Sequence, residues 1–439
     1  MLKDALQEVP IIDVHTHLVG GKLGARGLHD ILLYHMSVSD LYAAGCPDGG
    51  RLTEYPGWPD RAESHGRILS ALPWIEKSWN TSTAWGMRIA LGELYDWHEP
   101  ITANNWTRLD DLIRERADDG VWHREVMRRA NIVRFGTEIA RREQGKDDDI
   151  LHYALEWAFF TRCQWGEFDT ALYELERCWG KSPDSPTPIG MGGRPVPERE
   201  IRSLEDVHAA IEHYVGAIPV QDILATATHL STDLNLRPVS DDEMIAAIAR
   251  RDCAGPDERD IYAAYINEAF LKSFAAIADR VVFQFSFGAE PLPHETASRL
   301  DQRAIQQLGE LIARHPRVQF TCFLSSAHAN QSMCTLCREL PNLSLAGYWW
   351  HNFFPEIIQR VIGERLDMLP WNKQIGFFSD AYCIEWAYAK AGMVRGIMAK
   401  VLEQRIALGQ FRERDAVEFS RAVFLEAPRE RLGMTPSSR

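Results

Sequence analysis

Short apolar runs alternate with amphipathic stretches along most of the chain. Six runs are rich in Val, Ile or Phe and are near-continuous, as in parallel strands that are covered on both faces. These predicted strands span residues 9–15, 131–138, 280–288, 317–324, 342–350 and 373–380. The stretches between the last four, at 298–316, 325–341 and 351–370, have helical character. Strands and helices alternating at this spacing predict right-handed βαβ units around a parallel sheet.

Two regions of the first half interrupt this alternation. Residues 40–120 are rich in Trp, Pro and Gly, contain two predicted helices, and are interpreted as a mainly helical insertion after the first strand. Residues 180–200 are rich in Pro, Gly and Ser and are predicted to form a surface loop, because the alternation resumes after them. The chain from about Gly392 to Leu432 is predicted to be helical. A length of 439 residues suits about three domains or one large α/β barrel with insertions over residues 1–439.

Composition and charge exclude several classes of protein. The chain is 45% apolar and 25% charged, which is the balance of a globular protein and not of a disordered one. With 48 Lys and Arg against 62 Asp and Glu, the net charge of −14 argues against nucleic acid or an anionic membrane as the partner. No apolar run approaches the ~18 residues of a membrane span, and the N-terminus has no apolar signal core. We therefore expect a cytoplasmic protein with a small-molecule substrate, and a homo-oligomer is left open.

The eight cysteines are scattered and are predicted to be reduced thiols. Cys334 and Cys337 form a C-x-x-C pair, a spacing that occurs in redox and zinc sites. No second pair and no thioredoxin-like context accompany them. We interpret both as small, half-buried helix residues.

His15 and His17 directly follow the apolar run VPIID. Residues two apart in a strand point to the same side, so these imidazoles could bind one divalent ion such as zinc, although an isolated H-x-H also arises by chance. Asp380 ends the last predicted strand, where it could be a metal ligand or a helix N-cap. In a closed eight-stranded barrel the first and last strands are neighbours, and active sites lie at the C-terminal ends of the strands. The three residues could then form a catalytic metal site with an open position for water.

These residues also carry a family resemblance. The sequence resembles the amidohydrolase superfamily and, within it, the uronate (glucuronate) isomerase family. The matching stretches are, in chain order, HTHL (15–18), LHDILLYHM (28–36), TANNW (102–106), NIVRFGTE (131–138), RVVFQFSFGA (280–289), AGYWWHN (346–352) and FFSDA (377–381). The resemblance implies a distorted (β/α)8 TIM barrel with one divalent metal, usually zinc, held by His15, His17 and Asp380.

The departures from the family pattern concern the grip on the substrate carboxylate. Tyr382 stands where the family has an Arg, Ser286 where it has a His, Pro291 where it has an Arg, and Met36 where it has a Tyr, whereas the neighbouring His35 is kept. Arg can pair with a carboxylate through two hydrogen bonds and Tyr cannot. The pattern therefore predicts that the metal is retained and that the substrate has changed.

Four further residues are candidates near the mouth of the barrel. His229, in a plausible fourth strand, lines up with a family histidine and could be a catalyst or a satisfied polar residue. His328, after the sixth strand, could be an additional ligand, a proton carrier or a substrate contact. Trp349 and Trp350 match a pair of tryptophans in the family, of which one could stack on a sugar ring while the other belongs to the core.

The metal site supports two chemistries. In aldose–ketose isomerisation, Asp380 moves a proton between C1 and C2 of the sugar, His35 or His229 carries a second proton, and the metal charge stabilises the intermediate. In hydrolysis, metal-activated water attacks a lactone, ester or amide with Asp380 as general base. We favour a uronate isomerase-like enzyme acting on a sugar acid or related carbohydrate. A lactonase or amidohydrolase is the alternative, and a non-catalytic paralogue with a structural metal is the third hypothesis.

Overall fold

Eight parallel strands form one curled sheet at the centre of the molecule. The structure is a computed structural model that describes residues 2–47, 60–138, 145–155, 171–180, 197, 199–230, 235–288, 301–349 and 353–434, apart from the side chains at 228 and 229. The strands are β1 (Ile11–Thr16), β2 (Ile132–Glu138), β3 (Leu151–Leu155), β4 (Ile223–Leu230), β5 (Val282–Phe287), β6 (Phe320–Leu324), β7 (Leu343–Ala346) and β8 (Gln374–Ile375). Each strand pairs in parallel with the next one along the chain. The predicted fold class, a distorted (β/α)8 barrel, is confirmed.

The segment that follows β8 closes the sheet against β1. The backbone N–H of Asp380 donates to the carbonyl of His15 at 3.0 Å, and that of His17 donates to the carbonyl of Ala381 at 2.8 Å. These two bonds bring the beginning and the end of the barrel together. The predicted neighbourhood of the first and last strands therefore exists in the fold.

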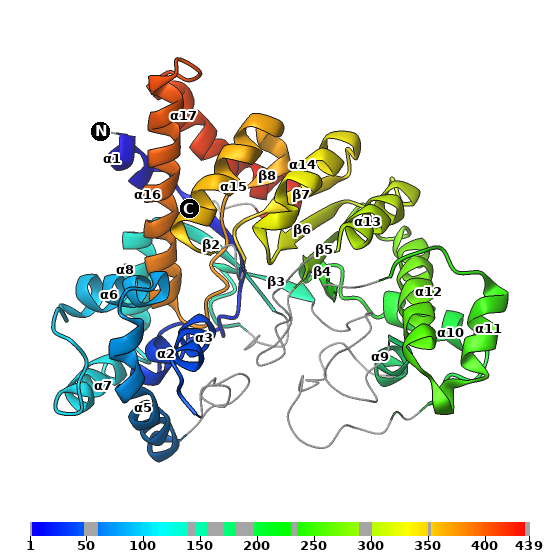
Figure 1. The fold of residues 1–439 in the computed structure, drawn as a ribbon, viewed down its shortest axis with the longest axis horizontal. Coiled ribbons are helices and arrows are strands. Elements are labelled where there is room, and N and C mark those ends of the chain that lie inside the picture. The colour runs from blue at the N-terminus through cyan, green and yellow to red at the C-terminus, as the bar shows by residue number, and fades with distance from the viewer. Residues whose placement is uncertain are drawn as a thin grey trace.

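A helical insertion after the first strand is also confirmed. It comprises α2 (Leu28–Leu32), α3 (His35–Ala43), α5 (Arg61–Ile75), η1 (Glu76–Ser78), α6 (Ser82–Tyr95) and α7 (Trp106–Arg114), and it leads into α8 (Gly120–Ala130) before β2. It holds more helices than the two that the sequence predicted. In Figure 1, α5, α6 and α7 lie at the lower left of the strands, away from the helices that follow β3 and β4.

The remaining helices mostly connect successive strands. They are α1 (Leu2–Gln7), α9 (Ala171–Cys178), α10 (Leu204–Gly216), α11 (Asp241–Ile248), η3 (Arg251–Cys253), α12 (Pro256–Phe274), α13 (Gln302–Arg314), η4 (Ala327–Ala329), α14 (Asn330–Glu339), α15 (Pro355–Met368) and η6 (Trp371–Lys373). The chain ends with α16 (Ile384–Ala407), α17 (Glu413–Arg421), η7 (Ala422–Glu426) and α18 (Ala427–Leu432). Local chemistry sets several helix starts, because the side chains of Asp119, Ser203 and Ser240 accept backbone N–H groups at the first turns of α8, α10 and α11.

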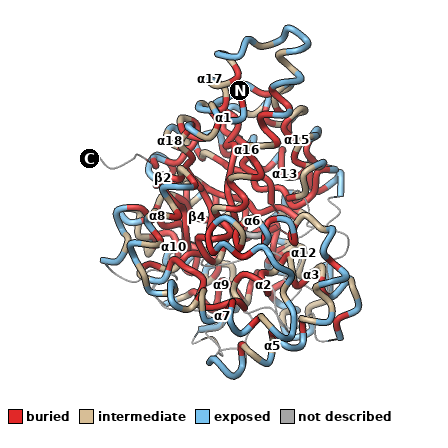
Figure 2. The backbone as a smooth tube through the Cα atoms, turned by 90° about the vertical axis from the view of Figure 1, so that its left-hand side faces the viewer, coloured by how far each residue is buried: buried red, intermediate tan, exposed pale blue. Residues whose placement is uncertain are grey.

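The apolar core has two parts. One lies between the sheet and the helices and includes the stripe of α13, whose Ala304, Leu308, Leu311 and Ile312 are all buried. The other lies inside the barrel and contains Ile12, Val14, Phe323, Ala346, Trp349, Ile375, Phe378, Leu425, Leu432 and Met434. Figure 2 shows buried residues filling the middle of the molecule, with exposed residues mostly on the outer turns. No helix among the described residues has the length and apolar character that a membrane span requires.

Some predicted details differ from the structure. The last predicted strand, 373–380, is a strand only at Gln374–Ile375, because the next residue, Gly376, donates its N–H to the carbonyl of Val423 at 2.8 Å instead of to a strand. Cys334 and Cys337 are fully buried in α14 rather than half-buried, and every described cysteine is a free thiol. Most of the loop predicted at 180–200 lies outside the described residues.

Candidate metal centre

Strand β1 delivers the two histidines to the C-terminal end of the barrel. All six residues of β1 are buried, since Ile11, Ile12 and Val14 pack into the core. His15 is the second-last residue of this strand, and His17 lies one residue beyond the end of the strand. Their rings meet edge to face, with centroids 5.1 Å apart. The strand therefore places both imidazoles at one point on the rim.

Asp380 reaches the same point from the other end of the chain. Its φ of 56° lies in the left-handed region, which is uncommon for residues other than glycine and is tolerated best by Asn and Asp. This turn follows the short β8, and its backbone is bonded to β1 as described above. The carboxylate thus faces His17, which is 363 residues away in the chain, and its neighbour His15.

The donor atoms of these three residues have the spacing of a metal site. Asp380 Oδ1 lies 3.3 Å from His15 Nε2 and 3.1 Å from His17 Nε2. One ligand atom from each residue falls within 4.8 Å of the others. Ligand atoms ~2.0 Å from a tetrahedral zinc ion lie ~3.3 Å from one another. Two imidazole nitrogens and one carboxylate oxygen therefore fit a divalent ion of the zinc type, with a position left for substrate or water.

His35 holds the second oxygen of Asp380. Its Nε2 lies 3.2 Å from Asp380 Oδ2, at the first position of α3. Burial lowers the pKa of His35, and the hydrogen bond to Asp380 opposes that effect only in part. Burial by itself raises the pKa of Asp380, but the hydrogen bonds of His15, His17 and His35 outweigh it and hold the pKa well below its usual range. The arrangement favours an ionised carboxylate beside a neutral imidazole.

Glu138 is a site residue that the sequence analysis missed. It ends β2, and its Oε1 lies 2.8 Å from His17 Nδ1. A carboxylate on the far nitrogen fixes the tautomer of a metal-binding histidine and leaves Nε2 free to coordinate. Burial by itself lowers the pKa of His17, but the charges and hydrogen bonds of Glu138 and Asp380 outweigh it and raise the pKa to about 9. The sequence did contain a signal for Glu138, because Glu138 is an acidic residue at the end of a predicted strand, as Asp380 is.

We predict that Glu138→Gln flattens the pH dependence of metal binding. Below pH 9 the metal must displace the proton of His17, so zinc affinity of the unchanged protein should rise about tenfold per pH unit between pH 6 and 8. Without the carboxylate the pKa of His17 falls, so the slope should shrink, while affinity at pH 8 drops about tenfold. Zinc titrations at several pH values measure both quantities. Glu93→Gln is the matched control, because Glu93 accepts from Tyr388 on the helical surface, and equal slopes in all three proteins would contradict the assignment.

Tyr382 lies beside the histidines. Its ring stacks on His17, with centroids 4.4 Å apart and an angle of 17° between the planes, and it is half-buried. It also approaches the ring of His35 at 5.6 Å. The structure therefore places an aromatic ring, not a guanidinium, next to the candidate metal.

The other predicted residues have mixed placements. Trp349 is buried in the core inside the barrel, which favours a packing role over stacking on a sugar. His328 is exposed on η4 and does not belong to the metal-binding group found among the described residues. The backbone of His229 lies in β4, in register with Ser286 of β5, but its side chain, Trp350 and Pro291 are outside what the structure describes.

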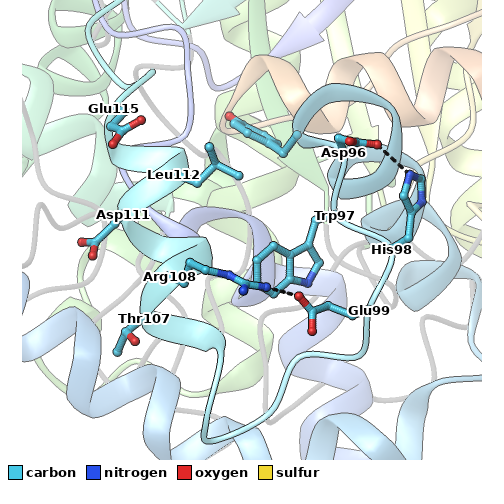
Figure 3. Close-up of a pocket in the computed structure, with 10 residues that line it drawn as sticks. Asp96, Trp97, His98, Glu99, Thr107, Arg108, Asp111, Leu112 and Glu115 are labelled. Carbon is cyan, nitrogen blue, oxygen red and sulfur yellow. Dashed lines mark hydrogen bonds and ion pairs between the residues drawn. The ribbon is translucent and has the colours of Figure 1, made fainter.

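A separate cleft opens on the helical insertion. It lies between the end of α6 and α7 and is lined by Tyr95, Asp96, Trp97, His98, Glu99, Thr107, Arg108, Asp111, Leu112 and Glu115 (Figure 3). The Arg108 guanidinium lies over the Trp97 ring and pairs with Glu99. This cleft shares no residue with the metal centre.

Comparison with known proteins supports the fold. No protein-family profile and no curated protein matches the chain. Among solved structures, a uronate isomerase from Thermotoga maritima superimposes with a TM-score of 0.73 at 12% identity, covering 98% of this chain and 96% of that one. A uronate isomerase from Bacillus halodurans gives 0.66 at 18% identity, covering 99% and 96%. A proposed metal-dependent hydrolase from Lactobacillus casei gives 0.60 at 13% identity, covering 98% and 97%. The chain thus resembles uronate isomerases in fold over its whole length.

Proposed function

We propose that this protein is a metal-dependent enzyme that interconverts the aldose and ketose forms of a sugar acid or a related carbohydrate. The observation that carries the proposal is the convergence of His15, His17 and Asp380 at the C-terminal end of the barrel. The whole-length likeness in fold to uronate isomerases supports this reaction class. A divalent ion held by the three residues would polarise the substrate carbonyl as a Lewis acid.

The side chains around the centre could move the protons that the reaction needs. Asp380, kept ionised by its three imidazole partners, would accept the proton from C2 and return it to C1. His35, neutral and in contact with the other carboxylate oxygen, would accept the proton of the O2 hydroxyl and pass it on to the O1 carbonyl oxygen. These transfers balance, because each side chain ends in the state in which it began.

A metal-dependent hydrolase, such as a lactonase, is the second candidate. Tyr382 favours it, because the aromatic ring on His17 cannot grip a substrate carboxylate as an Arg could. The likeness in fold to the proposed metal-dependent hydrolase from Lactobacillus casei is compatible with a hydrolase. In that reaction Asp380 would take the proton from the water that attacks the carbonyl.

We predict that Tyr382→Arg lowers the KM for uronates. A guanidinium at this position would face the centre and could form two charge-assisted hydrogen bonds to the carboxylate. Hydrogen bonds to charged groups contribute roughly 1.5–3 kcal/mol, so a fall of about tenfold to 100-fold is expected. Steady-state kinetics on glucuronate and on the neutral internal lactone of its C6 carboxyl group measure the effect. Tyr382→Gln is the control that removes the ring without adding charge, and an unchanged KM for Tyr382→Arg would place residue 382 away from the substrate.

One assay separates the candidate functions. Zinc-loaded protein is incubated with glucuronate, galacturonate and the corresponding aldonolactones, and the products are followed by NMR. Formation of ketose without acid release supports the isomerase, whereas ring opening of the lactones to free acid supports the hydrolase. A protein that binds zinc tightly but turns over none of them would contradict both and favour the non-catalytic paralogue.

A further inference from the structure

Lys390 is a buried cation directly behind the candidate metal centre. It lies on α16 with only 2% of its surface exposed, and burial lowers its pKa to about 8. Its Nζ donates to the hydroxyl of Tyr34 at 2.6 Å and to the backbone carbonyl of Ser379 at 2.7 Å. The aromatic rings of Phe353 and Tyr34 lie 4.3 and 4.8 Å from the ammonium. A buried ammonium is costly unless such partners compensate it, so its presence calls for a reason.

The partners of Lys390 hold the turn that carries Asp380. Tyr34 connects Lys390 to the next residue of the turn, because the Tyr34 hydroxyl donates to the backbone carbonyl of Asp380 at 3.1 Å. Two successive carbonyls, those of Ser379 and Asp380, are thus bound by one ammonium–phenol unit. Asp380 has a φ of 56°, a backbone conformation that costs energy in any residue with a Cβ and persists only where its surroundings hold it.

Asp380 is therefore fixed from two sides. The imidazoles of His15, His17 and His35 contact its carboxylate, whereas Lys390 and Tyr34 bind the backbone behind it. A different backbone conformation of this turn would move the carboxylate away from the nitrogens of His15 and His17. Ligand residues need this kind of outer support to keep their geometry.

We propose that Lys390, acting together with Tyr34, is a positioning residue that sets the place of the Asp380 carboxylate in the metal centre. The proposal rests on the metal centre of the proposed function and adds to it a buried cation from α16. Because it concerns the geometry of a ligand, its first measurable consequence is metal affinity, before any turnover.

The same helix provides a matched control. Arg395 is also a buried cation of α16, with 1% of its surface exposed. Its guanidinium donates to the carbonyls of Ala130 and Val9, which precede β2 and β1 at the opposite end of the barrel. Arg395 thus ties backbone carbonyls to α16 as Lys390 does, but far from the histidines in the fold.

The test compares zinc affinity and thermal stability in Lys390→Met, Tyr34→Phe and Arg395→Met. Zinc affinity of the folded proteins is measured by competition with a fluorescent chelator. We expect a loss of 10–100-fold in affinity for Lys390→Met and a smaller loss in the same direction for Tyr34→Phe. Arg395→Met should lower Tm and leave zinc affinity within about twofold of the unchanged protein.

The outcomes are distinguishable. Unchanged zinc affinity in both Lys390→Met and Tyr34→Phe would overturn this inference while leaving the metal centre in place. An equal loss in Arg395→Met would also overturn it, because the effect would then be general destabilisation. If Lys390→Met does not fold, the single hydroxyl removed in Tyr34→Phe decides the matter. Failure of the unchanged protein to bind zinc would overturn the proposed function itself and this inference with it.

Discussion

Replacing both His15 and His17 by alanine is expected to abolish retention of a divalent metal. Structural zinc sites bind with about 10–16 kcal/mol, so each of four ligands contributes roughly 3 kcal/mol, and losing two should weaken binding on the order of 10⁴-fold. In this variant Asp380 would supply a single oxygen ligand, whereas three residues supply ligand atoms in the unchanged protein. Metal content after dialysis, measured by mass spectrometry, and zinc titration report the effect.

The barrel of this double variant is expected to remain folded. The bonds that join the segment after β8 to β1 use the backbone of residues 15, 17, 380 and 381, which the substitutions leave in place. His15 packs against the rings of Phe323 and Phe378, so its removal should cost a few kcal/mol through the cavity that it leaves. His17 is half-buried and should cost less. Circular dichroism and Tm check this expectation.

A matched pair of surface histidines controls for nonspecific binding. His98 and His328 are both exposed, and neither belongs to the metal-binding group among the described residues. The double change of these two residues to alanine should leave metal content unchanged. Full metal occupancy in the His15→Ala, His17→Ala variant would refute the assignment of the ligands.

The sequence predicted the barrel well where strands are long and apolar. The runs around Val133, Phe285 and Phe323 became β2, β5 and β6 because near-continuous apolar residues suit strands that are buried on both faces. Strand β3 was not predicted, since its five residues LHYAL include a polar pair and lie next to the charged run KDDD. A strand this short takes its structure from pairing with its neighbours β2 and β4.

The place of Asp380 was predicted, but its conformation was not. The apolar run GFFSD suggested that the last strand continues to the aspartate. Instead the chain leaves the strand at Gly376, where a Cβ would come within 2.8 Å of Val423 Cγ2. This contact depends on a segment almost fifty residues later, so local sequence could not reveal it. Asp380 itself has a left-handed backbone, which a prediction of continuous strand does not include.

The supporting residues show a different limit of sequence reasoning. Lys390 stands in the helical stretch IEWAYAKAGMV, where a lysine among apolar residues indicates burial, but nothing local names its partners. Glu138 likewise ends a correctly predicted strand, and its histidine lies just beyond the end of another strand. Pairing between distant segments determines both roles, so a single sequence can mark such residues as candidates but cannot name their partners.

Asp380→Asn is expected to remove most of the turnover while preserving the site. Asn has the same shape and tolerates the left-handed φ of 56°, so the backbone bonds of Tyr34 and Lys390 can persist. The amide cannot accept a proton as the carboxylate does, and a general base typically contributes 10²–10⁴-fold to the rate. We therefore expect kcat to fall about 10³-fold. Zinc affinity should fall less, because His15 and His17 remain and an amide oxygen still faces them.

The chain contains a close control for this substitution. Asp96 also has a left-handed backbone, with a φ of 54°, but it ends α6 on the surface of the insertion. Asp96→Asn makes the same chemical change in the same conformation and should leave both kcat and zinc affinity unchanged. If Asp380→Asn kept turnover within tenfold of the unchanged protein while binding zinc, Asp380 could not be the base. His35, which contacts the same carboxylate, would then have to transfer the proton. In that case, His35→Gln should alter the pH profile of kcat.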